Sequence, residues 1–116
     1  MNQGPLDRLT ASRAQSIAAL TALHRDLDGV IKASESSNAD DEHDPEGATI
    51  AFERAQLSAL LGQAQDRLAD TDRALTRLRD GSYGICERCG ERISPERLAA
   101  RPSARTCIGC ARLTGR

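Results

Sequence analysis

Apolar residues near the start of the chain follow a helical pattern. They recur at intervals of three and four residues in one stretch, Leu20, Leu23, Leu27 and Val30. This spacing is typical of a helix that packs one side against a second helix. Pro5 suits the first position of this helix because its φ angle is already helical, and the pattern fades near Ser34. Arg13 and Ser16 interrupt the earlier part of the stripe.

A second helical pattern begins after an acidic stretch. Asp44 is a favourable N-cap, Pro45 fits the first helical position, and Glu46 lies where the helix dipole favours an anion. Gly81 suits the left-handed residue that ends such a helix. The apolar stripe between these ends is formed by Leu57, Leu61, Ala64, Leu68, Thr71, Leu75 and Leu78.

These patterns predict a mainly α protein. Because a short connection makes consecutive helices antiparallel neighbours, we expect an antiparallel two-helix coiled-coil hairpin over residues 1–80, with an acidic tip near residues 35–48. A dimeric bundle built from the same helices is the alternative. Residues 81–116 are rich in Gly, Pro and Cys and lack long periodicity, so they predict a second, small module.

Composition supports the helical reading and excludes several classes. Aromatic residues make up only 2% of the 116 residues, which argues against a compact sandwich or barrel. The net charge is -1, so the chain is not a general polyanion binder. No apolar run approaches the roughly 20 residues that span a bilayer, and the N-terminus has no signal pattern. We therefore expect a cytoplasmic protein with no membrane partner.

The cysteines form two C-x2-C pairs. The first is Cys86 with Cys89, and the second is Cys107 with Cys110, after 17 intervening residues. Four thiolates at this spacing can close a tetrahedral site around one structural Zn²⁺, with no open position for catalysis. Gly90 and Gly109 are small residues that let the backbone turn there. Two disulfides or a redox motif are the alternatives, although the redox motif lacks its βαβ context.

The cysteine module resembles the four-cysteine zinc finger of the DksA/TraR family of transcription regulators. The helical hairpin with its acidic tip is similar too. The resemblance implies a non-enzymatic protein that binds bacterial RNA polymerase through the secondary channel and modulates open-complex stability. The resemblance is carried over the finger by Tyr83, Gly84, Cys86, Cys89, Gly90, Ile93, Arg97, Leu98, Ala100, Arg101, Pro102, Ala104, Cys107 and Cys110.

The tip departs from the family's motif, Asp-x-x-Asp-x-Ala. An alignment without gaps puts His43 at the first Asp, Glu46 at the second and Ala48 at the Ala, whereas a slip of one residue puts Asp44 at the first Asp. The resemblance implies that Asp44, Glu46 and Ala48 contact the active centre of the polymerase. The chain reads His43-Asp44-Pro45-Glu46-Gly47-Ala48.

The resemblance also implies docking residues and a second ligand. Arg97 and Arg101 fall at family positions and are expected to make a docking contact or an internal salt bridge. Some relatives act with the alarmone ppGpp, which is held partly by a basic residue on the second helix. The equivalent residue here is Asp70, so we expect that ppGpp is not held in the same way.

Three other functions fit parts of the sequence. Seven arginines against three acids after residue 80 favour a zinc-ribbon protein that binds DNA or RNA. The acidic tip and the lack of base-stacking aromatics count against it, and we expect no sequence-specific DNA binding. A thiol redox protein and a coiled-coil adaptor are the remaining alternatives.

Overall fold

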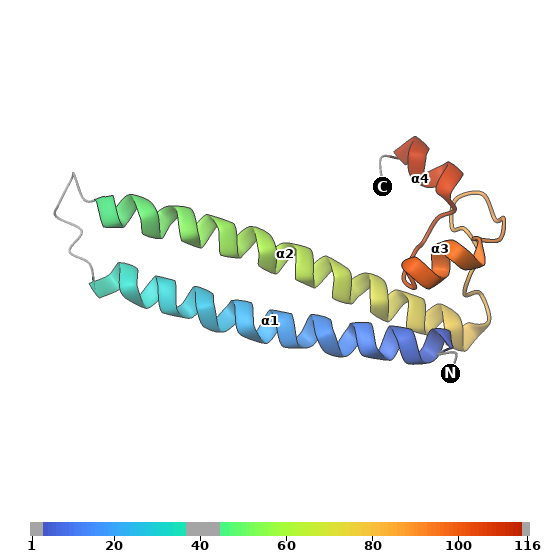
Figure 1. Cartoon of the computed structure of the whole chain (residues 1–116), viewed down its shortest axis with the longest axis horizontal. Coiled ribbons are helices and arrows are strands. Elements are labelled where there is room, and N and C mark those ends of the chain that lie inside the picture. The colour runs from blue at the N-terminus through green and yellow to red at the C-terminus, as the bar shows by residue number, and fades with distance from the viewer. Residues whose placement is uncertain (1–3, 37–44, 115–116) are drawn as a thin grey trace. The chain divides into compact units, whose positions relative to one another are not determined.

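The computed structural model describes residues 4–36 and 45–114 (Figure 1). Helix α1 spans Pro5–Ser36 and helix α2 spans Pro45–Asp80. Two short helices follow, α3 at Pro95–Ala100 and α4 at Ile108–Thr114. The predicted class is confirmed: the protein is mainly α, with a two-helix hairpin followed by a small four-cysteine module.

The ends of the long helices lie close to where the sequence predicts them. Helix α1 begins at Pro5 and continues two residues beyond Ser34. Helix α2 begins at Pro45, and Gly81 after its last residue has a φ of 86°. This left-handed conformation is one that glycine adopts without steric cost. The predicted N-cap, Asp44, lies outside the described residues.

The chain divides into two compact units. One combines Met1–Gln15 with Arg67–Arg116, and the other is Ser16–Asp66. In each unit a segment of α1 lies antiparallel to a segment of α2 (Figure 1). No helix in the described part of the chain has a stretch apolar enough to cross a membrane.

The helix pair of the first unit packs around small and polar side chains. Leu9 and Thr71 are completely buried, and Ala74 is nearly so. The Thr71 hydroxyl donates to the Arg67 carbonyl (2.8 Å) within its own helix and lies 3.5 Å from the Ser12 hydroxyl. This arrangement satisfies the buried oxygen. Arg13, which interrupts the apolar stripe, donates from Nε to Asp72 Oδ1 at the exposed edge (2.6 Å).

The second unit has a thinner core. Ser16 and Ala64 are buried, whereas the leucines of both predicted stripes in this unit are only half-buried. Two helices alone cannot enclose a large side chain, so most of the apolar stripe remains in contact with water. Ser16 therefore interrupts the apolar pattern without leaving the helix interface.

Candidate metal centre

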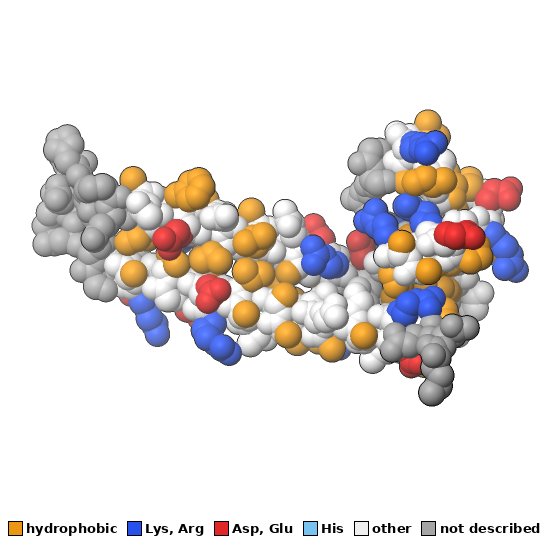
Figure 2. Space-filling view, viewed as in Figure 1, with side chains coloured by type: hydrophobic (Ala, Val, Ile, Leu, Met, Phe, Trp, Pro, Cys, Tyr) orange, Lys and Arg blue, Asp and Glu red, His pale blue; other side chains and the backbone are white. Residues whose placement is uncertain are grey.

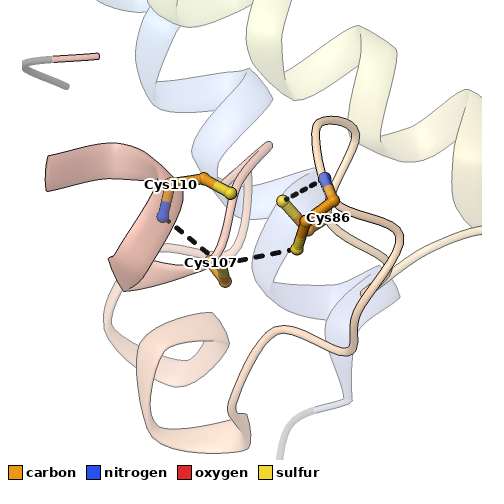
Figure 3. Close-up of side chains that lie close together, drawn as sticks. Cys86, Cys107 and Cys110 are labelled. Carbon is orange, nitrogen blue, oxygen red and sulfur yellow. Dashed lines mark hydrogen bonds between the residues drawn. The ribbon is translucent and has the colours of Figure 1, made fainter. Parts of the chain in front are cut away.

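The four cysteines converge on one point. Their sulfur atoms all lie within 4.8 Å of one another, and Cys89 Sγ is 3.8 Å from Cys107 Sγ (Figure 3). Cys86 and Cys110 are buried, Cys107 is half-buried and Cys89 is exposed. All four are free thiols rather than disulfides. The geometry therefore brings together the complete ligand set that the spacing predicts.

The first cysteine pair lies in a tight loop. The Cys86 N–H donates to the Glu91 carbonyl (2.8 Å), and the Gly90 N–H donates back to the Cys86 carbonyl (3.0 Å). Gly90 has a φ of 77°, as expected for the turn that returns the chain. The Cys89 N–H points at Cys86 Sγ (3.5 Å). This loop fixes both sulfurs on the same side of the backbone.

The second pair lies at the start of α4, a helix that the sequence pattern does not predict. The Cys110 N–H points at Cys107 Sγ (3.5 Å), and the Ala111 N–H donates to the Cys107 carbonyl (2.9 Å). Gly109 is helical and not left-handed. A Cβ there would meet Cys107 Sγ at 3.9 Å, an ordinary contact. Gly109 was expected to let the backbone turn, but it does not use the conformational freedom of a glycine because the helix itself makes the turn.

Backbone and side-chain hydrogen bonds join the two cysteine loops. The Glu87 N–H donates to the Arg105 carbonyl (2.9 Å), directly connecting the first loop to the segment before Cys107. Arg97 Nε donates to the Thr106 carbonyl (2.8 Å), and the Tyr83 hydroxyl donates to the Pro102 carbonyl (2.7 Å). These bonds hold both halves of the ligand set in place beside the small apolar core.

We expect replacement of Tyr83 by Phe to weaken this closure. The substitution keeps the ring but removes the donor to Pro102, so the carbonyl of a half-buried segment loses its partner. The free energy of unfolding of the zinc-loaded protein should fall by about 1 kcal/mol, as measured by denaturant titration. An unchanged midpoint would show that water replaces this bond at no cost.

The sulfur environments differ in their acidity. The hydrogen bond from the Cys89 N–H is the main cause that lowers the pKa of Cys86, to about 6. Burial is the main cause that raises the pKa of Cys110, to about 12. A bound Zn²⁺ deprotonates its thiol ligands. Four sulfur donors suit a closed tetrahedral zinc site, so the ion is structural and no coordination position remains for a substrate.

Comparison with known proteins agrees with this geometry. Residues 81–113 match the family model described as the prokaryotic DksA/TraR C4-type zinc finger. The chain belongs to the DksA/TraR family. The predicted single structural Zn²⁺ is confirmed by this match and by the cluster of four sulfurs.

Relatives of this DksA/TraR protein have several names. General stress protein 16O of Bacillus subtilis is 32% identical over 97 residues, covering 77% of this chain and 60% of the relative. The RNA polymerase-binding transcription factor DksA of Caulobacter vibrioides is 54% identical over 37 residues, covering 32% of this chain and 26% of that protein. The chain thus spans less than two thirds of the curated relatives it matches.

A solved structure resembles this DksA/TraR protein over most of its length. The structure of transcription factor DksA2 from Pseudomonas aeruginosa covers 92% of this chain, and the match covers 82% of DksA2. The TM-score is 0.55 and the sequence identity is 25%. The likeness therefore extends beyond the finger to the helical hairpin.

The DksA/TraR finger is attached to the end of α2 by Arg77. Its Nη2 donates to the carbonyls of Ser82 (3.0 Å) and Ile85 (2.9 Å). In return, the Arg77 carbonyl accepts from the N–H groups of Ser82 (2.9 Å) and Tyr83 (3.1 Å). One arginine thus fixes the path of the chain from the helix into the first cysteine loop.

Ion pairs provide a second attachment, which no pattern in the sequence reveals. Glu87, between the first two cysteines, pairs with Arg73 on α2 and with Arg105 Nε (3.3 Å). Arg105 Nη1 also lies 3.8 Å from Asp70. Burial raises the pKa of Glu87, but the hydrogen bond and charge of Arg73, with Arg105 and Arg77, outweigh it and lower the pKa overall. Glu87 is therefore held as a carboxylate.

The predicted docking arginines have different surroundings. Arg97 is half-buried, and its bond to Thr106 is internal to the finger rather than a salt bridge. Arg101 is exposed. Both line a cavity of about 620 Å³, together with Arg88, Arg105 and Asp70. Their docking role stays a prediction.

The predicted tip residues are described only in part. Asp44 lies outside the described residues. Glu46 lies in the first turn of α2, but its side chain is outside the described part. Ala48 is exposed on α2. The polymerase contacts expected of these three residues stay predictions.

Proposed function

We propose that this protein regulates transcription by binding bacterial RNA polymerase through the secondary channel, and that it modulates open-complex stability without acting as an enzyme. The main support is the likeness to DksA2, which extends over 92% of the chain and so includes hairpin and finger together. Relatives named as RNA polymerase-binding transcription factors match about a third of the chain, over 37 and 39 residues. This proposal implies a cytoplasmic protein.

In this mechanism the hairpin is a reaching element and the finger is its base. We propose residues 1–80 and 81–116 as the corresponding modules. Helix α2 is continuous over 36 residues, and at 1.5 Å per residue it extends about 54 Å. Arg77 and the Glu87 ion pairs attach the finger to its end. A helix held in this way can carry the tip deep into a narrow channel.

The acidic tip is the proposed acting part. The stretch from Glu35 to Glu46 contains six acids and neither Lys nor Arg. Carboxylates near a site that contains Mg²⁺ or cationic side chains change the local electrostatic energy. We propose that Asp44, Glu46 and Ala48 meet the active centre and shift the lifetime of the open complex. Screening should make this association sensitive to salt.

The proposed function does not depend on ppGpp or on direct binding of nucleic acid. Asp70 is an acid at the position where relatives use a basic residue for ppGpp, and it lies beside Arg105. We therefore keep the expectation that ppGpp is not held in the family's manner. The arginine-lined cavity supports nucleic-acid binding as the alternative function.

The decisive experiment measures binding of the zinc-loaded protein to RNA polymerase from its own host, with open-complex lifetime followed in the same samples. We expect binding and a changed lifetime. The Asp44→Asn/Glu46→Gln double variant should lose most of the effect on lifetime. Asp28→Asn/Asp66→Asn is a matched control, because it removes two exposed charges from α1 and α2 away from the predicted tip motif.

Other results would redirect the proposal. Binding without a change in lifetime would indicate a protein that only occupies the polymerase. Absence of binding near physiological salt would exclude the proposed function. Retention of nucleic acid alone at that salt would then favour the zinc-ribbon alternative.

A further inference from the structure

One side of the hairpin in the Ser16–Asp66 unit contains a groove. Its volume is about 590 Å³, and both long helices form its walls. Figure 2 shows hydrophobic side chains along this region of α1 and α2, with charged side chains beside them. The groove is lined by Arg25, Asp26, Gly29, Val30, Ala33, Ile50, Glu53, Gln56 and Leu57.

One of the residues that line the groove is a glycine with open space beside it. Gly29 lies within α1, and a Cβ built there would meet no atom within 4 Å. Val30, Ile50 and Leu57 are half-buried beside it. A glycine in a helix interior costs helix stability, and no neighbour among the described residues lies close enough to require its small size. The apolar floor is therefore open to an external group.

A projecting side chain lies on the same side of α2 as the groove. Leu60 is 42% exposed. It follows Glu53 and Gln56 at helical spacings of seven and four, which put all three residues on one face. Leu60 lies two turns from Glu53, or about 10 Å along the axis. In an isologous two-fold contact both copies use the same patch, so the patch must fit itself. A groove and a projecting side chain on one face can meet this requirement.

The charges around the groove are also self-complementary. Arg25 and Asp26 are adjacent on α1, and Glu53 lies opposite on α2. All three side chains belong to exposed residues. A wholly acidic or wholly basic partner would meet like charge on one part of this rim. A second copy turned end to end brings Arg25 of each chain close to Asp26 of the other.

We propose that this groove is a contact between two copies of the chain. The two-fold axis crosses the helices near Gln56. Leu60 of each copy fills the hollow beside Gly29 of the other, and Arg25 faces Asp26 across the contact. The inference does not depend on the proposed function. A paired copy has this side of its hairpin covered, so pairing would compete with any partner that surrounds the hairpin.

The test is sedimentation equilibrium of the full, zinc-loaded chain over a concentration series. We expect a monomer–dimer equilibrium. Leu60→Gln removes the apolar knob from a partly exposed position and should weaken dimerisation at least about tenfold. Ile17→Gln is the matched control, because Ile17 is 40% exposed but does not line the groove. It should leave the dimer constant unchanged.

The Gly29→Gln variant distinguishes an effect on dimerisation from an effect on the stability of the monomer. The substitution raises helix propensity, so the monomer should be at least as stable to heat while its dimerisation is lost. Charge reversal of Arg25 or Asp26 alone should weaken the dimer, and the Arg25→Asp/Asp26→Arg double variant should restore it. A wild-type chain that stays monomeric at every concentration overturns the proposal. A dimer that is insensitive to Gly29→Gln and Leu60→Gln overturns it too.

Discussion

A chelator that strips zinc from the protein is expected to unfold the module proposed at residues 81–116 and to leave most of the helical circular dichroism intact. The finger core is small: the buried cluster is Cys86, Ile93 and Cys110, with Leu98 and Cys107 packed against it. Three of these five residues are ligands, so the ion and the core are lost together. Structural zinc supplies on the order of 10–16 kcal/mol in small fingers, which this core cannot replace.

A ligand substitution should produce the same effect. Cys110→Ser removes a buried sulfur, and we expect loss of stoichiometric zinc in native mass spectrometry together with rapid alkylation of the remaining thiols. Arg88→Ala is the control, because Arg88 is exposed between the first two cysteines and leaves all four sulfurs in place. Alkylation at the same rate with and without chelator would contradict zinc ligation.

The helical signal provides a second, separate outcome. Helices α1 and α2 contain 32 and 36 residues, so they dominate the far-ultraviolet spectrum. Retention of this signal after chelation would support the proposed modules at residues 1–80 and 81–116. Collapse of the signal with the metal would show that the hairpin depends on the finger for its helix pairing.

Glu87→Ala is expected to destabilise the zinc-loaded protein by about 1–2 kcal/mol. The side chain of Glu87 is only 16% exposed and pairs with both Arg73 and Arg105. Its removal leaves two arginines without this carboxylate. The arginines are themselves partly exposed, so water limits the loss. Thermal unfolding followed at the finger should show a lower midpoint, and the variant should respond less to added salt.

An exposed ion pair elsewhere in the same unit provides the comparison. Asp72 pairs with Arg13 across the two long helices, and both side chains are close to half exposed. We expect Asp72→Ala to cost well under 1 kcal/mol. Equal losses for Asp72→Ala and Glu87→Ala would mean that the Glu87 pairs contribute no more than an ordinary surface contact. The zinc content of both variants should also be measured, because it distinguishes destabilisation by loss of the metal from destabilisation by loss of the ion pair.

Local signals in the sequence predicted the helix ends and the ligand set. Pro5 and Pro45 begin the long helices, and Gly81 follows the second, because each of these residues restricts or frees its own backbone. The two C-x2-C pairs predicted the sulfur cluster because two short loops leave few other places for four thiols. Thr71 belonged to the predicted apolar stripe and is fully buried.

Features that depend on distant residues were not predictable in this way. Nothing in the sequence distinguishes Glu87 from the other charged residues. Its partner Arg73 lies 14 residues earlier, on another element. Helix α4 begins inside a cysteine pair, where apolar periodicity is too short to detect. Ser16 reads as a break in the stripe, but the two small residues Ser16 and Ala64 are buried where the helices meet. Sequence spacing alone does not show whether a small polar residue interrupts the apolar stripe or lies buried between the two helices.

The position of Glu87 between two metal ligands links the protein to the zinc supply of its cell. Glu87, which pairs with Arg73 on α2, lies on the loop between the first two of the four clustered cysteines. A chain made during zinc shortage would therefore lack both the folded loop and the anion for Arg73. Such a chain would present open thiols and an unfolded end to proteases, whereas its long helices would still form. The amount of working protein would then follow the availability of the metal as well as the rate of synthesis.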